Sequence, residues 1–166
     1  QTSGEQVGLI TNARDAAEIA RFEVDETEAL SLDEATQKIP AEAVSERISP
    51  LEVATRRSPI QARSIAENLA RVTLTDGLDV VNLILSSYNR LPRDAALLPI
   101  VPKVTPELAL TLATMKQAGF TVTVFLIKNS KDHIDAATAL AAHRISLIHI
   151  EHERDLHEIS LQHIGR

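Results

Sequence analysis

The sequence predicts an α/β fold with a mainly parallel open sheet and helices on both faces. Three consecutive segments support this: a buried-type strand at 96–101, a helix at 105–119 and an apolar strand at 120–127. A further helix and the strand Ser146–Ile150 continue the alternation, which is typical of right-handed crossovers between parallel strands. Because aromatic residues make up only 2% of the chain, its core must consist of Leu, Ile, Val and Ala, which favours layered helices on a parallel sheet.

Composition limits the class of protein. A chain of 166 residues with 44% hydrophobic and 24% charged residues suits a single α/β domain, or a domain fragment, over 1–166. The net charge of -6 argues against a nucleic-acid surface, which needs clustered cations to bind phosphates. Without cysteine, disulfides, thiolate metal sites and cysteine nucleophiles are excluded.

The chain lacks an apolar run long enough to span a bilayer, so we expect this segment to be soluble and cytoplasmic, without membrane contact. It begins at Gln1, and its only methionine is Met115. We therefore expect further residues to precede Gln1 in the natural protein.

The amino-terminal half begins with a short apolar strand, Gln6–Thr11. An acidic surface insertion of helices and loop is expected at about 23–57, where carboxylates far outnumber cations. Within it, Ser31–Glu34 has the form of a capping box, and Pro40 suits the first position of a second short helix.

Two helices are predicted before the first buried strand. The first begins with Ser58 as N-cap, Pro59 in the first turn and Gln61 as the capping-box partner. Asp76-Gly77 ends this pattern, and Leu91–Asp94 turns the chain after the second helix. The expected buried faces are Ile65, Leu69 and Val72 in the first helix, and Val81, Ile84, Leu85 and Tyr88 in the second.

The next helix has the clearest end signals in the chain. Thr105-Pro106-Glu107 combines an N-cap, a first-turn proline and an early carboxylate, and Gly119 suits the left-handed residue that ends the helix. Its buried face should hold Leu108, Leu112 and Met115. Phe120–Ile127 follows as a strand that is apolar on both faces, as expected when helices cover both sides of a sheet.

Asn129 or Ser130 can cap another helix, which precedes Ser146–Ile150. A last short helix is predicted at Asp155–Ile159. The apolar positions expected to carry the helix after Ser130 are Ile134, Ala137, Leu140 and Ala141.

The candidate site is the carboxyl edge of the sheet, where α/β folds usually bind ligands. The loop after Val101 offers lysine and hydroxyl groups but no carboxylate. A binding site and ordinary loop polarity both remain open for these residues. The candidate residues that follow predicted strands are Thr11, Asn12, Lys103, Thr105, Lys128, Asn129 and Glu151.

Sequence motifs for several chemistries are missing. The five glycines form neither a dinucleotide-binding nor a P-loop pattern, and G-x-S-x-G does not occur. The acidic insertion lacks EF-hand spacing, and Thr75-Asp76-Gly77 is interpreted as a turn. We predict no catalytic, metal or cofactor-binding residue and favour solvated or edge histidines over a metal site for His143, His149, His152, His157 and His163.

Four segments resemble one bacterial family. The runs Leu69–Leu78, Arg90–Ala95 and Gln117–Val124, together with Val7–Asn12, are similar to the carboxyl-terminal part of von Willebrand factor A-like proteins of the uncharacterised family catalogued as domain of unknown function fifty-eight. The resemblance covers most of the chain except the acidic insertion. It implies a doubly wound, Rossmann-like sheet, upstream helices that anchor the whole protein in the inner membrane, and a MoxR-type AAA ATPase as partner.

Many von Willebrand A domains hold magnesium through D-x-S-x-S on the first strand, a threonine in a later loop and an aspartate after the fourth strand. By this resemblance D-x-S-x-S and the first strand would lie before Gln1, and the fourth-strand position falls near Val101-Pro102-Lys103, which has no aspartate. Val7–Ile10 would lack its usual neighbour, so either the fragment rearranges or a second copy pairs with the exposed edges.

The leading hypothesis is a non-enzymatic protein-interaction module of this fold without a working metal-ion-dependent adhesion site. The alternative is a small-molecule or nucleotide-responsive α/β domain, either sensory or enzymatic. A third hypothesis is a structural fragment whose activity depends on residues before Gln1.

Overall fold

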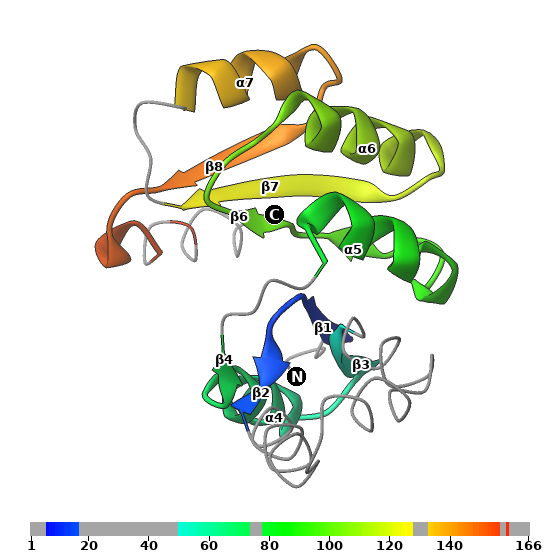
Figure 1. Cartoon of the computed structure of the whole chain (residues 1–166), viewed down its shortest axis with the longest axis vertical. Helices are drawn as coiled ribbons and strands as arrows, with labels where there is room; N and C mark the ends of the chain where they lie inside the picture. The colour runs from blue at the N-terminus through cyan, green and yellow to red at the C-terminus, as the bar shows by residue number, and fades with distance from the viewer. Residues whose placement is uncertain (1–5, 17–49, 74–77, 128–132, 157–158, 160–166) are drawn as a thin grey trace, which may run out of the picture. The chain divides into compact units, whose positions relative to one another are not determined.

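The computed structural model describes residues 6–16, 50–73, 78–127, 133–156 and 159. The chain divides into two compact units, Gln1–Leu83 and Ile84–Arg166, and each is described by itself. The boundary falls inside helix α5 (Val80–Ser87) (Figure 1). The expectation of one domain over 1–166 stays a prediction.

The second unit is built on a four-stranded sheet whose described pairs are all parallel. Strand β7 (Thr121–Ile127) is central, with β5 (Ala96–Leu97) and β6 (Ile100–Val101) along one side and β8 (Ser146–Ile150) along the other (Figure 1). The sequence-based prediction of an α/β fold with parallel strands is confirmed for this unit.

The predicted strand at 96–101 is split by Pro99. Both halves keep one register against β7, since Ala96 pairs with Thr121 and Ile100 with Phe125. The carbonyl of Pro99 accepts a hydrogen bond of 2.8 Å from the Phe125 N–H, although proline has no N–H of its own to donate. The prediction of a buried strand is wrong at Ile100, which is 64% exposed.

Helix α6 (Pro106–Gln117) confirms the predicted end signals. The Thr105 hydroxyl accepts a hydrogen bond of 3.1 Å from the Leu108 N–H, and Pro106 occupies the first turn. At the other end Gly119 has φ +104°, a left-handed value that favours glycine. Gly119 and Phe120 donate to the carbonyls of Lys116 and Met115, which is the bond pattern of a Schellman motif.

The core of the second unit lies between the sheet and two helices. Figure 1 shows α6 and α7 (His133–Ala141) on the same side of the sheet. The largest fully buried side chains all come from these elements: Leu108, Leu112, Met115, Val124, Leu126 and Leu140. Burying aliphatic groups of this size is the main stabilising contribution to folding.

Burial along β7 alternates, whereas the sequence predicted equal burial of both faces. Val122, Val124 and Leu126 are buried, but Phe125 is half-buried and Ile127 is 37% exposed. Side chains alternate between the faces of a strand, so the face under α6 and α7 is covered more completely than the other.

The apolar face predicted for helix α7 is correct at Leu140 and wrong at Ile134 and Ala141. Ile134 is 73% exposed and Ala141 is also exposed, while Ala136 and Leu140 are buried. Strand β8 occupies Ser146–Ile150 as predicted. The proposed caps Asn129 and Ser130 lie outside the described residues.

The first unit contains a separate antiparallel sheet. Strand β1 (Val7–Thr11) pairs with β3 (Leu51–Arg56), so the predicted strand exists, but it does not belong to the parallel sheet of the described residues. A Cβ at Gly8 would lie 2.7 Å from the Thr55 hydroxyl oxygen, so close approach of β3 requires glycine there.

Strand β3 falls within 23–57, where the sequence predicted a surface insertion. Its pairing gives β1 a neighbour from the same chain. Pairing by a second copy stays a prediction. The capping box Ser31–Glu34 and Pro40 lie outside the described residues.

Helix α4 (Gln61–Leu69) begins three residues after the predicted cap, because a turn at 59–60 precedes it. Gln61 is not a capping-box residue: it is 6% exposed, and its Nε2 donates to the carbonyls of Val7 and Ala54, both at 2.9 Å. One amide therefore links β1 and β3 to the start of α4.

A second antiparallel pair of short strands includes β4, which follows α4 in the sequence. Strand β2 (Arg14–Asp15) pairs antiparallel with β4 (Val72–Thr73), and Arg71 forms a salt bridge of 3.5 Å with Asp15. Val72 therefore belongs to a strand, although the sequence placed it on the face of the preceding helix. Leu69, from the same predicted face, is 46% exposed.

Asp79 caps α5, since its Oδ1 accepts hydrogen bonds from the N–H groups of Val81 and Asn82 at 2.8 and 3.0 Å. The predicted apolar stripe is correct at Val81 and wrong at Leu85, which is 56% exposed. The 3-10 helix η1 (Tyr88–Arg90) follows, and the Tyr88 ring packs edge-on against Phe120. Thr75-Asp76-Gly77 lies outside the described residues.

Within the described part of the chain, the model contains no helix with the length and apolar character needed to cross a membrane.

Candidate functional site

The predicted site lies at the carboxyl edge of the parallel sheet in the second unit. Strands β6, β7 and β8 end at Val101, Ile127 and Ile150, and their parallel pairing places these ends at one edge. Strands β6 and β8 flank β7, so they lie about 10 Å apart, twice the usual spacing of neighbouring strands.

Three predicted residues meet at this edge. Lys103 and Thr105 follow β6, and Glu151 follows β8, and all three are exposed. The edge therefore has a cation beyond one flanking strand and a carboxylate beyond the other.

The hydroxyl of Thr105 already has a structural role as the N-cap of α6. Lys103 lies in the loop between β6 and α6. A protonated lysine has no lone pair for a cation, and Pro102 and Val104 offer no side-chain oxygen. The residues present therefore do not fit a magnesium site. Among the described residues, no group of three or more His, Cys, Asp or Glu side chains is arranged to hold a metal.

The chain beyond β8 is organised by Asp155. Its Oδ2 accepts hydrogen bonds from the N–H groups of His152 and Glu151 at 2.8 and 3.0 Å, and its own N–H donates to the His152 carbonyl. The Asp155 carboxylate thus supplies the acidic half of a capping box, while the bond to the His152 carbonyl is a backbone turn. The helical turn begins at residue 153, two residues before the predicted start. The hydrogen bond from the His152 N–H holds the pKa of Asp155 below its usual range.

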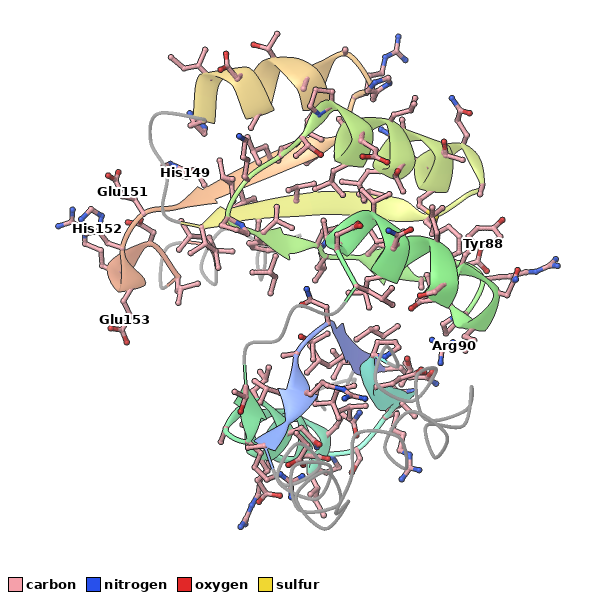
Figure 2. All side chains as sticks on the ribbon, in the orientation of Figure 1. Tyr88, Arg90, His149, Glu151, His152 and Glu153 are labelled. Carbon is pink, nitrogen blue, oxygen red and sulfur yellow. The ribbon has the colours of Figure 1, made fainter. Side chains whose placement is uncertain are left out.

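Figure 2 shows the resulting geometry. Glu151, His152 and Glu153 project away from the sheet beyond β8, whereas His149 lies back along the strand. Because Asp155 fixes the turn through backbone groups, the side chains of Glu151 and His152 remain available at the surface.

Four other predicted site residues are not brought to this edge by the described structure. Thr11 ends β1 and Asn12 follows it, and β1 belongs to the antiparallel sheet of the first unit. The Thr11 hydroxyl accepts a hydrogen bond from the Ala13 N–H, and the Asn12 amide donates to the Leu78 carbonyl. Lys128 and Asn129 lie outside the described residues.

Sequence reasoning missed a pair of histidines. His133, the first residue of α7, stacks on His149 of β8 with ring centroids 4.7 Å apart. His149 is half-buried on β8, which pairs only with β7 among the described strands, so it is an edge residue as predicted. His133 shares a helical face with Ala136 and Leu140, a spacing visible in the sequence that would have placed it against the sheet.

Comparisons with protein-family models, curated proteins and solved structures found no match to this chain.

Proposed function

We propose that the chain is a non-enzymatic protein-interaction module with a von Willebrand factor A-like, Rossmann-like fold, and that the carboxyl edge of its parallel sheet contacts the partner. One observation carries the proposal: exposed Lys103 and Glu151 flank the ends of three parallel strands, on a framework held by a buried aliphatic core. Opposite charges on either side of one edge favour an oriented protein contact.

The donor groups at this edge support a contact that does not depend on a bound metal. In the proposed fold, adhesion normally uses a carboxylate after the strand that corresponds to β6, and this chain has Lys103 there. The partner suggested by family resemblance is a MoxR-type AAA ATPase.

The direct test is binding of the purified full chain to a MoxR-type ATPase from the same organism, measured by calorimetry with and without Mg²⁺. We expect binding that is independent of Mg²⁺ and that weakens at least about tenfold in Lys103→Glu and Glu151→Lys. Arg144→Glu is the matched control, because it reverses an exposed charge immediately before β8, at the opposite edge of the sheet.

Two results would overturn the proposal. One is a loss of affinity for the partner in Arg144→Glu as large as in the Lys103 and Glu151 variants, which would show that the partner does not bind specifically at the carboxyl edge. The other is tight Mg²⁺ binding by the chain that is lost in Thr105→Ala, which would restore a metal-dependent mechanism.

A further inference from the structure

One side of the parallel sheet ends in a regular strand that carries no carboxylate, lysine or arginine. Strand β8 pairs with β7 at all 5 of its residues without a register shift, and among the described strands β7 is its only partner. The strand also contains no proline. An edge strand turns part of its N–H and C=O groups away from the sheet, so β8 presents a template for one more strand.

The other side of the sheet is built differently. Strands β5 and β6 have 2 residues each, and Pro99 lies between them. Short strands and proline are features that protect an edge from pairing with another chain. Among the described edges of this sheet, only the β8 edge lacks such protection.

Helix α7 exposes apolar side chains on its outer flank. It packs on β8 and contacts α6, and its half-buried Ala139 lies on one flank (Figure 1). On the opposite flank Ile134 is 73% exposed, and Ala141 is also exposed. Because the exposed flank faces away from α6, it lies on the outer side of the sheet, next to the β8 edge. The helix layer therefore continues the apolar character of this edge.

The charges at the two ends of β8 are opposite. Arg144 precedes the strand, Glu151 and Glu153 follow it, and all three are exposed. An antiparallel β8 strand from a second copy, centred on Ile148, brings Arg144 of each copy close to the two carboxylates of the other copy. Parallel pairing of the two strands would instead bring like charges together, which is unfavourable. The edge is therefore complementary to itself in the antiparallel orientation.

We propose that two copies of the chain dimerise by antiparallel pairing of their β8 strands, which joins their parallel sheets into one continuous sheet. The twofold axis passes beside Ile148, so that Ile148 lies opposite itself and Ser146 lies opposite Ile150. The contact is isologous and uses both β8 edges, so assembly stops at two chains. The outer flanks of α7 then meet across the axis, which removes Ile134 and Ala141 from water. Dimerisation does not depend on the proposed ATPase partner.

The first test is sedimentation of the purified full chain over a range of concentrations. We expect a species of twice 18.1 kDa, the mass of one chain. Ile134→Lys places a charge in the contact between the helices and should weaken dimerisation at least about tenfold. Leu110→Lys is the matched control, because Leu110 is 63% exposed but belongs to α6, and it should leave the dimer intact.

Charge reversal tests the antiparallel orientation. Arg144→Glu and Glu153→Arg should each weaken the dimer about tenfold, because the twofold axis repeats every altered contact. Mixing the two variants brings opposite charges together again and should restore a dimer with one chain of each kind. Arg144→Glu should meanwhile keep its affinity for the ATPase, so failure of the dimer and failure of the proposed function give different results.

The register can be tested directly because the chain has no cysteine. Ile148→Cys places two thiols opposite each other, within reach of a disulfide bond. Ser146→Cys places them four residues apart along the paired strands, a distance of about 13 Å. Oxidation should therefore crosslink the first variant and leave the second as separate chains under denaturing conditions.

Several results would exclude this dimer. One is a chain that remains monomeric at every concentration, and another is a dimer that Leu110→Lys dissociates as strongly as Ile134→Lys. A mixture of the two charge variants that stays monomeric would contradict the antiparallel orientation. A disulfide in Ser146→Cys but not in Ile148→Cys would contradict pairing centred on Ile148.

Discussion

The two compact units are stabilised in different ways. In Ile84–Arg166, fully buried aliphatic side chains from α6, β7 and α7 form one core. Among the described residues of Gln1–Leu83, the buried side chains are only those of Gln61 and Val81. That unit instead has two short antiparallel pairs of strands, and Gln61 of α4 joins one of them, β1 and β3, through hydrogen bonds.

The difference shows how a hydrophobic core makes the structure of a unit easier to predict from its sequence. In the second unit, neighbouring elements along the chain also pack together, so local signals and burial favour the same structure. In the first unit, β1 and β3 are separated in sequence by a segment that includes residues 17–49. The paired strands β2 and β4 are separated by a segment that also includes α4. Such pairings depend on distant parts of the chain and are weakly encoded in local patterns.

The largest expected effect comes from breaking the core of the second unit. Leu112→Ala removes a side chain that is 0% exposed and should lower the free energy of unfolding by about 2–5 kcal/mol. Leu110→Ala is the matched control on the same helix, because Leu110 is 63% exposed, and its effect should stay within about 0.5 kcal/mol. Urea unfolding measures both, and similar losses in the two variants would contradict the assigned core.

The next effect should appear in the first unit. Gln61→Leu removes the donor shared by the Val7 and Ala54 carbonyls, and the loss of buried hydrogen bonds should cost about 1–3 kcal/mol. Hydrogen exchange should become faster in β1 and β3 while the centre of α6 keeps its protection.

Arg63→Ala is the control for this variant. It removes an exposed salt bridge to Glu67 on the same helix and should cost under about 0.5 kcal/mol. Equal destabilisation by the two substitutions would show that Gln61 is not the link between β1 and β3.

The second unit was predictable because its signals are local. Thr105-Pro106 and Gly119 specify the ends of α6, and the apolar run Phe120–Ile127 specifies β7. The structure confirms both elements. The errors there arise from tertiary context. Pro99 interrupts a strand that reads as continuous, and α7 turns Ile134 away from the sheet where the apolar pattern placed it inside.

The first unit was less predictable because the position of Gln61 in the sequence is compatible with two structural roles. Its position after Ser58-Pro59 matches a capping box, yet its amide binds two strands that local sequence does not bring together. The candidate site shows the same limit. Lys103, Thr105 and Glu151 could be placed at one edge because parallel strands share their polarity, while Thr11 and Asn12 depended on a strand pairing that differs from the expected one.

The smallest expected effect concerns an aspartate cap, a feature that occurs in both units. Asp79 before α5 and Asp155 after β8 each accept hydrogen bonds from backbone N–H groups at the start of a helical turn. The N–H of Asn82 lowers the pKa of Asp79, and that of His152 lowers the pKa of Asp155. Because the folded pKa lies below the unfolded value of about 3.9, each stabilising contribution is present above that pH and is lost as pH falls through the folded pKa.

Asp79→Asn and Asp155→Asn should therefore flatten the dependence of thermal stability on pH between pH 5 and pH 2, each by a similar small amount. Asp135→Asn, an exposed first-turn residue of α7, is the control and should leave the slope in place. NMR titration of the side-chain carboxyl groups measures the pKa of each aspartate directly. Asp79 is exposed and Asp155 is half-buried, and both act through local backbone bonds, so the contrast in core burial should not alter them. A much larger effect at Asp79 would show that the first unit depends on its polar contacts even more than its sparse burial indicates.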